Sequence, residues 1–414
     1  MRFIVIGITD HPQPLFSTEV LQVIRNGRVF SGGKRHHAIV EPLLPENATW
    51  VDITVPLDDV FEQYLTLRDA SQVIVFASGD PLFYGFANTI RRKMPQAHIA
   101  VYPAFNALQM LAHRLVMPYH DMRCVSLTGR PWQAFDRALI ERSPLIGVLT
   151  DGVRSIPAIA QRMLDYGYTN YNMFVGEHLG NPEEECVCSL TLEEAARRCF
   201  RQPNCAILNS NPSFGGVSTT PSSFGIPDNQ FALLNGREKM ITKMPVRLLT
   251  LQALDLPRRH VLWDIGACTG SVSIEARLLF PHLQIEAFEI RPECEDIIRE
   301  NMRRHSAPGI GVHIGDFTLR PSHSDPRPDA VFIGGHGGRL KEIMAQVVEH
   351  LQPGGVIVMN SVSSPVVDRI TARPSSHQLF EEACQSLRLK THPALHLTLN
   401  GFNPIDILKC ELPS

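Results

Sequence analysis

Long apolar runs are what this 414-residue sequence lacks most clearly. No stretch approaches the roughly 20 apolar residues that a membrane-spanning helix requires, so we expect no membrane partner. The short apolar stretch at the start is interrupted by Asp10, and no small-residue cleavage site follows it. It therefore predicts a first β-strand rather than a signal peptide, and we expect a cytoplasmic protein.

An excess of charge of either sign is also missing. The sequence holds 39 lysines and arginines against 42 aspartates and glutamates, for a net charge of −3. A near-neutral chain without a stripe of basic and aromatic residues argues against a nucleic-acid partner. The balance leaves room for a few cations gathered around one acidic ligand.

Closely spaced cysteines are almost absent. Nine cysteines are scattered along the chain, and the one close pair is Cys186 and Cys188. A spacing of one intervening residue matches no common zinc pattern. We therefore expect free thiols, as in a reducing compartment, and no metal site.

The length and the rhythm of apolar segments predict two α/β domains. At roughly 150 residues per domain, the chain has room for two or three. Short apolar runs alternate with helix-like segments over residues 1–208, which is typical of parallel sheets. In this half we expect strands at Phe3–Ile8, Trp50–Val55, Gln72–Ala77, His98–Tyr102, Cys124–Thr128, Leu145–Thr150, Asn172–Val175 and Cys205–Leu208.

Residues 209–238 are predicted to link this first domain to a second one at 239–414. Serine, threonine, glycine, proline and asparagine dominate the start of the segment, although a long surface loop within one domain is the alternative. The alternation then resumes. In the second half we expect strands at His260–Ile265, Gln284–Glu289, Gly311–Ile314, Ala330–Ile333 and Gly355–Asn360, helices at Ser271–Leu279, Glu293–Arg304, Arg339–His350 and Gln378–Leu387, and a closing antiparallel pair at Ala394–Leu399 and Pro404–Leu408.

A glycine turn between a strand and a helix is the most informative segment. The strand beginning at His260 leads into Asp264, Gly266 and Gly270, after which a helix begins. Gly266 permits a tight turn, and Gly270 lets the backbone approach a ligand closely. The next strand ends 19 residues beyond Gly270, at Glu289, where an acid can accept both hydroxyls of a ribose.

Three details of this region favour S-adenosylmethionine over a nicotinamide dinucleotide. Asp264 stands two residues before the first glycine, where a carboxylate can reach an ammonium group. The pattern lacks the third glycine that dinucleotide sites use for strand–helix packing. Asp316 follows the next strand, where it can meet an adenine amino group, while Cys268 replaces the usual middle glycine. A dinucleotide site and a purely structural turn are the alternatives.

A second glycine-rich loop follows the strand at residues 330–333. It contains Gly334, Gly335, His336, Gly337 and Gly338, so its backbone amides are open to an anionic group. The carboxyl ends of strands are where open α/β sheets bind ligands. His336 is a candidate catalytic acid or base, although a solvated loop histidine is the commoner case.

Cationic residues accompany glycine turns in the first half. Lys34 and Arg35 follow a glycine pair, and Arg130 follows another turn, which suits an anionic ligand or simply a solvated surface. A third segment, Ser-Gly-Asp-Pro, predicts a helix with Pro81 in its first turn and Asp80 as its cap.

Taken together, these motifs resemble those of a known enzyme family. Gly-Gly-Lys-Arg-His, Ala-Ser-Gly-Asp-Pro-Leu-Phe-Tyr-Gly, Ser-Leu-Thr-Gly-Arg-Pro, Leu-Thr-Asp and Val-Gly-Glu occur in the order typical of tetrapyrrole methylases. The second half is similar to class I methyltransferases, and Met-Ile-Thr-Lys and Phe-Ile-Gly-Gly-His-Gly-Gly also fit. The chain as a whole resembles the decarboxylating precorrin C5,15-methyltransferases. The first strand departs from the family's Gly-x-Gly-Pro-Gly turn, because only Gly7 is retained.

The resemblance implies a tetrapyrrole methylase (class III methyltransferase) domain fused to a Rossmann-like class I methyltransferase domain, each with one S-adenosylmethionine. It also implies a homo-oligomer. The substrate would be a precorrin or cobalt-precorrin, methylated at C5 by the first domain and at C15 by the second, which also decarboxylates the C12 acetate arm. The residues implied to bind the cofactor are Gly7, Ser78, Gly79, Asp80, Ala104, Phe105 and Asn106 in the first domain and Asp264, Gly266, Ala267, Gly270, Glu289 and Asp316 in the second.

Substrate carboxylates would pair with a separate set of residues. The candidates are Lys34, Arg35, Arg130, Lys243, Gly334, Gly335, Gly337 and Gly338. An arginine can hold a carboxylate with two parallel hydrogen bonds. Two other functions stay open at this point: an RNA or protein methyltransferase fused to a methylase-like domain, and a first domain that is only a scaffold.

Overall fold

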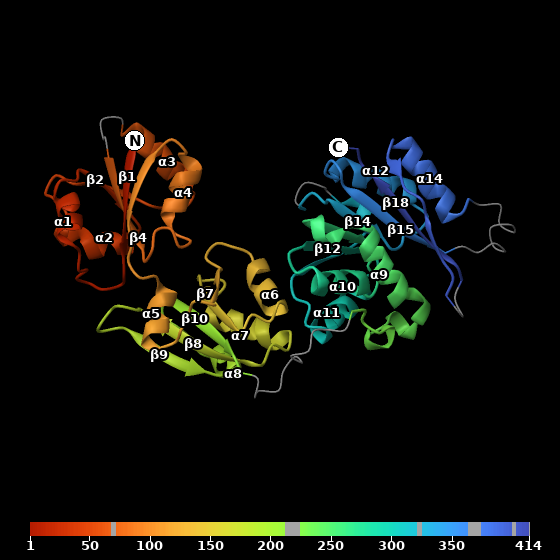
Figure 1. Cartoon of the computed structure of the whole chain (residues 1–414), viewed down its shortest axis with the longest axis horizontal. Coiled ribbons are helices and arrows are strands. Elements are labelled where there is room, and N and C mark those ends of the chain that lie inside the picture. The colour runs from red at the N-terminus through yellow and green to blue at the C-terminus, as the bar shows by residue number, and fades with distance from the viewer. Residues whose placement is uncertain (68–71, 212–223, 321–324, 363–373, 400–402, 414) are drawn as a thin grey trace. The chain divides into compact units, whose positions relative to one another are not determined.

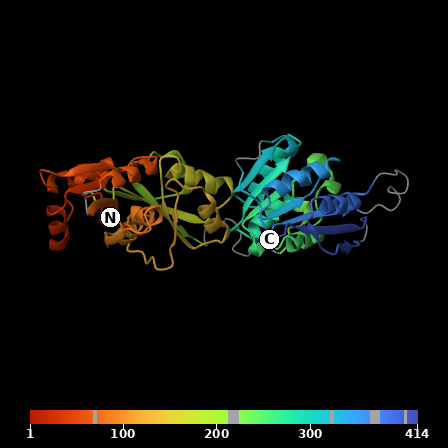
Figure 2. The same cartoon turned by 90° about the horizontal axis from the view of Figure 1, so that it is seen from above.

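The computed structural model describes residues 1–67, 72–211, 224–320, 325–362, 374–399 and 403–413. The chain separates into two compact units. The first comprises most of residues 1–211, and the second comprises residues 224–413 together with the short stretches 132–142 and 163–169. The bar colours in Figures 1 and 2 run from red to yellow-green over the first unit and from green to blue over most of the second.

A parallel five-stranded sheet opens the first unit. Its strands follow the order β3-β2-β4-β1-β5. They are β1 (Arg2–Ile8), β2 (Val29–Gly32), β3 (Thr49–Asp52), β4 (Gln72–Ser78) and β5 (His98–Tyr102). Parallel sheets are buried on both faces, which explains why β1 is a nearly continuous apolar run.

Successive residues of β1 point to opposite faces of this sheet and contact different helices. Phe3 and Val5 pack in one cluster with α3 (Leu57–Thr66) and α4 (Phe86–Lys93). Ile4, Ile6 and Ile8 pack in another with α1 (Thr18–Arg25) and α2 (Lys34–Val40). Figure 1 shows α1 and α2 on one side of the strands and α3 and α4 on the other.

A second, mixed sheet completes the first unit. Its order is β6-β7-β10-β8-β9, and only β6 and β7 run parallel. Helix α5 (Ala107–Arg114) packs Leu108 and Leu111 against Cys205 and Ile207 of β10. The elements are β6 (Arg123–Ser126), β7 (Leu145–Leu149), β8 (Tyr171–Glu177), β9 (Cys186–Leu190), β10 (Asn204–Ser210), α7 (Ile156–Asp165), most of which belongs to this unit, and α8 (Leu192–Arg197). Helix α6 (Gln133–Ile140) lies in the stretch 132–142 that is grouped with the second unit.

The second unit is built on an eight-stranded sheet. Its order is β13-β12-β11-β14-β15-β18-β16, with β17 also paired to β18. Strands β11 to β15 are parallel to one another, and β18 is antiparallel to its neighbours. The strands are β11 (Val261–Ile265), β12 (Gln284–Glu289), β13 (Ile310–Ile314), β14 (Ala330–Ile333), β15 (Val356–Val362), β16 (Lys390–Thr391), β17 (Leu395–Leu397) and β18 (Ile405–Glu411).

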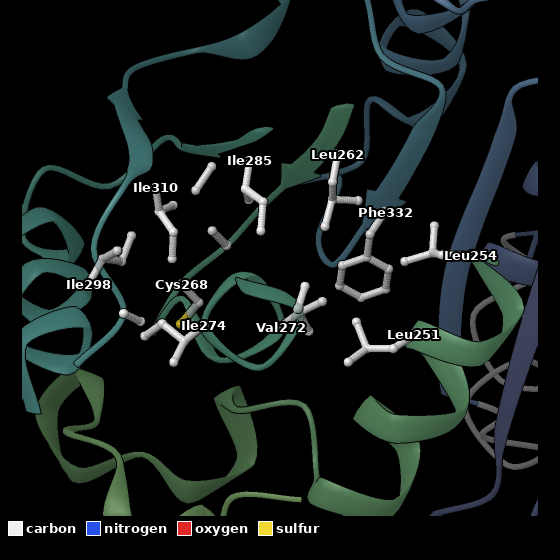
Figure 3. Close-up of a cluster of buried hydrophobic side chains, with 14 of the residues drawn as sticks. Leu251, Leu254, Leu262, Cys268, Val272, Ile274, Ile285, Ile298, Ile310 and Phe332 are labelled. Carbon is white, nitrogen blue, oxygen red and sulfur yellow. The ribbon is translucent and has the colours of Figure 1, made fainter. Parts of the chain in front are cut away.

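Helices cover both faces of this sheet. On one face lie α9 (Met244–Ala253), α10 (Ser271–Leu279) and α11 (Cys294–Arg304), and Figure 3 shows part of the apolar cluster that they form with the strands. On the other face lie α12 (Leu340–His350) and α14 (Ser376–Ser386). Within the described residues, none of the helices combines the length and apolar character that crossing a membrane would require.

The predicted α/β fold and its two kinds of domain are confirmed, and β17 and β18 form the expected antiparallel pair. Strand β2 was not predicted because it is only four residues long and ends in a glycine. Helix α9 was not predicted because its buried residues include Arg247 and Thr250. The predicted helix near Pro81 begins only at Phe86, so Asp80 caps a turn instead and accepts a hydrogen bond from the Leu82 N–H at 2.8 Å.

The predicted linker, 209–238, falls partly outside the described residues, between 212 and 223. Its later part belongs to the core of the second unit, where Ile226, Phe231 and Leu234 are buried. The N–H of Ile226 donates to the buried carboxylate of Glu275, which also accepts from Arg247 at 3.0 Å. The exact domain boundary stays a prediction.

Candidate active sites

The glycine turn after β11 brings two loops of the second unit together. Gly266 has a φ of +79°, and a Cβ there would lie 2.6 Å from the Gly335 nitrogen. The N–H groups of Gly266 and Ala267 both donate to the Phe288 carbonyl, at 2.8 and 3.1 Å. Only glycine allows such a close approach of two backbones.

Cys268, which replaces the usual middle glycine, does not open this turn. It adopts a φ of +53°, in the left-handed region that glycine favours. Its N–H donates to Oε2 of Glu289 at 2.8 Å. The turn therefore stays tight and points a backbone donor at the end of the next strand.

Glu289 is a buried carboxylate that stays ionised. Its residue is 2% exposed, and it accepts hydrogen bonds from Cys268 and from the backbone and guanidinium of Arg291. Burial raises the pKa of Glu289, but the hydrogen bonds from Arg291 and Cys268 outweigh burial and leave the pKa below its ordinary value. The side chain is an acceptor at neutral pH.

Asp316 forms a second acceptor at the end of β13. Its Oδ1 accepts from the N–H and hydroxyl of Thr318 at 3.0 and 2.8 Å. Its Oδ2 lies 2.6 Å from the guanidinium of Arg339. The hydrogen bond from Arg339, supported by Thr318, lowers the pKa of Asp316.

Asp264 lies behind the site rather than in it. It is 1% exposed, and its Oδ2 accepts from the Ser273 hydroxyl at 2.5 Å. Burial raises the pKa of Asp264 to about 6, although the Ser273 hydrogen bonds oppose the rise. Among the residues that the structure describes, its Oδ1 has no hydrogen-bond partner.

The glycine-rich loop after β14 carries His336 into the same region. Nδ1 of His336 accepts from the Gly338 N–H at 3.1 Å, and Nε2 lies 3.1 Å from the Ser376 hydroxyl. Burial lowers the pKa of His336. The ring is therefore neutral near pH 7, with its proton on Nε2, because Nδ1 acts as an acceptor.

These elements enclose a cleft of about 490 Å³ at the carboxyl ends of the parallel strands. Of the predicted residues, Gly266, Glu289, Asp316, Gly334, Gly335, His336 and Gly337 line it. The other predicted residues of this unit, Asp264, Ala267, Gly270, Gly338 and Lys243, do not line it. Gly270 instead caps α10 in the left-handed conformation, and Lys243 lies at the start of α9, where it donates to the Glu238 carbonyl at 2.9 Å.

In the first unit, Gly7 allows three chain segments to meet. A Cβ on Gly7 would lie 2.0 Å from the Gly79 carbonyl oxygen and 2.6 Å from the Ala104 nitrogen. The Gly79 N–H donates to the Ile8 carbonyl at 2.7 Å, and the Ala104 N–H donates to the Gly79 carbonyl at 3.3 Å. Gly7 and Ala104 thus shape the neighbouring cleft without lining it.

A polar network lies where the family's first glycine loop is altered. Asp10 accepts from the Arg35 guanidinium and lies 2.7 Å from Nδ1 of His178. Arg35 and His36 each hydrogen-bond the Ser78 hydroxyl at 2.9 Å. Burial, with Arg35 as a smaller contributor, lowers the pKa of His36 to about 4.

This network borders the cleft of the first unit, of about 330 Å³, which we call the first cleft; the cleft of the second unit is the second cleft. The predicted residues Arg35, Ser78, Gly79, Phe105 and Asn106 line it, together with residues from both sheets of the first unit. Asn106 also caps α5, where its side chain accepts from the Gln109 N–H at 3.0 Å. The remaining predicted residues, Asp80 and Lys34, do not line this cleft.

Arg130 occupies a separate, open cavity of about 510 Å³. Its guanidinium lies 5.2 Å from the centre of the Tyr84 ring and donates to the Ser126 hydroxyl at 2.8 Å. Arg92 also lines this cavity. Two arginines in one open cavity suit a ligand that carries carboxylates.

Sequence reasoning missed several residues at the two clefts. Arg291 and Arg339 line the second cleft, and Asp10 lines the first. Arg339 and Asp10 pair with groups from distant segments, so only the fold brings those partners together. Arg291 pairs with Glu289 of its own segment, and its position two residues beyond the predicted ribose acceptor was the available signal. Within the residues that the structure describes, no cluster of His, Cys, Asp and Glu could hold a metal ion.

Comparisons with known families match the two units separately. Residues 2–196 match the family model of tetrapyrrole (corrin/porphyrin) methylases. Residues 235–378 match the model of the precorrin methyltransferase domain. The residues that line the second cleft all fall within the part of the chain that the second model covers. Those that line the first cleft fall within the first model, except for residues 202–205 just beyond its end.

One curated relative matches most of the chain, and another matches less than half of it. The precorrin-6Y C(5,15)-methyltransferase [decarboxylating] of Sinorhizobium sp is 30% identical over 361 residues, which is 87% of this chain and 84% of the relative. The cobalt-precorrin-6B C(15)-methyltransferase (decarboxylating) of Salmonella typhimurium is 34% identical over 180 residues, or 43% of this chain and 92% of the relative.

Among solved structures, the precorrin-6Y C5,15-methyltransferase from Geobacter metallireducens is 32% identical, with a TM-score of 0.39. The match covers 46% of this chain and 98% of that one. The family assignment is based on the Sinorhizobium relative, because its similarity covers 87% of this chain and thus both units. The chain therefore belongs to the precorrin-6Y C5,15-methyltransferases (decarboxylating), a family of methyltransferases in cobalamin biosynthesis.

Proposed function

We propose that each unit binds one molecule of S-adenosylmethionine and that the two clefts methylate one corrinoid substrate at different carbons. The observation that supports this most is the presence of two separate clefts, each lined by residues predicted to bind the cofactor. Their volumes, about 490 and 330 Å³, lie in or near the range of roughly 300–1,000 Å³ for small-molecule sites.

The residues of the second cleft fit an adenosyl group. Glu289 would accept the ribose hydroxyls, and Asp316 would accept from the adenine amino group. Both carboxyls have lowered pKa values, so both act as acceptors at neutral pH. In the first unit, the corresponding contacts would come from Ser78, Gly79 and the capping turn at Asn106.

The cofactor supplies a methyl group that its sulfonium has already activated. The contribution of the protein is then to hold the acceptor carbon in line with that methyl group, and such positioning is worth up to about 7–11 kcal/mol. We assign C5 methylation to the first unit and C15 methylation to the second. The Salmonella typhimurium relative supports this division, because a protein named for the C15 reaction alone matches only 43% of this chain.

We place the C12 acetate arm beside His336. Decarboxylation breaks the bond between the carboxylate and its methylene carbon, leaves the electron pair in the conjugated ring, and takes up one proton from solvent at that carbon. The Nε2–H of a neutral His336 would hold the carboxylate in place by a hydrogen bond without stabilising it as strongly as an imidazolium, so its lowered pKa favours loss of carbon dioxide. Arg35 and Arg130 would pair with other carboxylates of the ring.

Titration calorimetry of the full chain with S-adenosylhomocysteine tests the two-site proposal. Two equivalents per chain are expected, and one equivalent would contradict it. Incubation with metal-free and cobalt-containing substrate, followed by mass spectrometry, then counts the methyl groups gained and carbon dioxide lost. Sedimentation of the same sample tests the proposed homo-oligomer.

A further inference from the structure

The carboxylate of Glu289 already accepts as many hydrogen bonds as it can hold. Oε1 accepts from the N–H and Nε of Arg291 at 3.0 and 2.8 Å. Oε2 accepts from the Cys268 N–H at 2.8 Å and from a terminal nitrogen of Arg291 at 3.0 Å. An ionised carboxylate offers about four acceptor positions, so no position is left for two ribose hydroxyls.

Only one of these donors can leave. The N–H groups of Cys268 and Arg291 belong to the backbone on either side of the site, and the Cys268 N–H is held by the tight turn beside Gly266. The guanidinium of Arg291 is the mobile group, because its side chain is 31% exposed and borders the open cleft. Its guanidinium also makes a weak contact with the Met240 sulfur, at 4.0 Å.

Arg339, the other arginine of this cleft, differs in this respect. On Asp316 its guanidinium contacts Oδ2, at 2.6 Å, while Thr318 uses Oδ1, and it also donates to the Thr318 hydroxyl at 2.9 Å. An adenine amino group needs one acceptor position, and Oδ2 can accept a second hydrogen bond. Arg339 can therefore stay in place when Asp316 binds a ligand, whereas Arg291 cannot stay on Glu289.

We propose that the Arg291 side chain occupies the ribose position of the second cleft, is displaced when the cofactor binds, and then pairs with a carboxylate of the corrinoid substrate. This inference rests on the proposed function of the cleft. It makes Arg291 a positioning residue that couples the two ligands. The cofactor prepares the substrate site by releasing a cation into a cleft that the substrate shares.

Such coupling is reciprocal. If the cofactor increases substrate affinity by releasing Arg291, the substrate must increase cofactor affinity by the same factor. The size of the factor is set by the pairing that is exchanged. A partly exposed arginine–carboxylate pair contributes up to about 1 kcal/mol, which corresponds to roughly a fivefold effect.

The first test compares S-adenosylhomocysteine binding by the full-length wild type and Arg291→Ala. The second-cleft site is the one that Glu289→Gln removes from the isotherm. We expect Arg291→Ala to bind S-adenosylhomocysteine about fivefold more tightly at that site, because nothing competes for Glu289. Arg299→Ala is the matched control: Arg299 pairs with Glu295 on the exposed face of α11, so its removal should leave binding unchanged.

The second test measures coupling with cobyrinic acid, a corrinoid that keeps its carboxylate arms. In the wild type, saturating S-adenosylhomocysteine should tighten cobyrinic acid binding about fivefold. Arg291→Ala should abolish this increase. Arg291→Lys keeps the charge without the planar fork, so we expect it to compete less at Glu289 and to retain part of the coupling.

Weaker or unchanged S-adenosylhomocysteine binding by a folded Arg291→Ala protein would overturn the inference, because Arg291 would then support the cofactor or be irrelevant to it. Coupling that persists in Arg291→Ala would overturn it as well. Failure of the proposed function looks different: the wild type itself would then show no S-adenosylhomocysteine site that Glu289→Gln removes. Circular dichroism of each variant separates a loss of fold from a loss of coupling.

Discussion

The two units reach a similar proposed task by different chemistry. In the second unit, two carboxylates at the ends of neighbouring strands, Glu289 and Asp316, point into the cleft. In the first unit, the cleft lies between elements of two sheets, and its lining carboxylate, Asp10, is already held by Arg35 and His178. A carboxylate pattern thus predicts one kind of methyltransferase site, whereas glycine turns and caps predict the other.

The largest expected effect distinguishes the two clefts by their dependence on a carboxylate. Glu289→Gln should weaken S-adenosylhomocysteine binding at the second cleft by roughly 100-fold or more, because hydrogen bonds to a charged group are worth about 1.5–3 kcal/mol each. Calorimetry should then find one equivalent per chain instead of two. C5 methylation should continue, and loss of both equivalents would show that the sites are not separate. Glu295→Gln, on the exposed face of α11, is the control.

The next prediction tests whether the units fold independently. Gly7→Ala should destabilise the first unit by roughly 3 kcal/mol, because the new Cβ would meet backbone atoms that cannot move aside. Gly33→Ala should cost little, since its Cβ would meet nothing closer than 3.8 Å. Urea unfolding followed by peptide-resolved hydrogen exchange measures each unit. Equal destabilisation of the second unit would contradict independent folding.

Acid should change the stability that one buried group contributes to each unit, and the two changes should have opposite signs. The folded pKa of His36, about 4, lies below its ordinary 6.5, so its contribution is complete above pH 6.5 and is lost as pH falls toward 4. The folded pKa of Asp264, about 6, lies above its ordinary 3.8. Its contribution to stability is therefore complete below pH 3.8 and is lost as pH rises toward 6.

Between pH 7 and pH 5 His36 should therefore remove about 2 kcal/mol from the stability of the first unit, while Asp264 adds about 1 kcal/mol to that of the second, where His336 with its lowered pKa opposes the gain. The free energy of unfolding in urea at each pH, resolved by unit, measures this difference. His36→Gln and Asp264→Asn should each remove the share of the pH dependence that comes from the replaced group. His120→Gln, at an exposed position, should change neither. A variant whose unit keeps the wild-type pH profile would refute the prediction for the replaced group.

The smallest effect concerns the glycine-rich loop. His336→Ala should slow decarboxylation about tenfold, which corresponds to 1.4 kcal/mol, while C5 methylation stays unchanged. His336→Gln, which keeps a donor near Ser376, should recover part of the rate. The measurement is carbon dioxide release under single-turnover conditions. An unchanged rate in His336→Ala would remove His336 from the proposed mechanism.

Much of this site can be predicted from the sequence because the signals are local. Gly266, Glu289 and Asp316 lie at fixed distances from strand ends, and parallel strands bring those ends to one edge of the sheet. Asp264 does not line the cleft, for a physical reason: it lies on a strand whose side chains alternate between faces, and its carboxylate accepts from Ser273 on α10.

Contacts across long stretches of sequence could not be predicted. The pairing of Asp10 with Arg35 and His178 joins three segments that carry no common pattern. The same holds for Arg339, which meets Asp316 only because two loops converge. The burial of Arg247 and Glu275 could not be predicted either, because an arginine and a glutamate normally indicate a solvent-exposed surface.

The Asp10 pairing has a consequence for how the chain can be divided. Asp10 follows a strand of one sheet, and His178 follows a strand of the other, so the carboxylate draws its partners from both halves of the first unit. An evolutionary or engineered split between those sheets would leave the buried Asp10 without His178, with Arg35 as its remaining partner in this network. We therefore expect the two sheets of the first unit to be inherited together, so that a gene fission does not separate them.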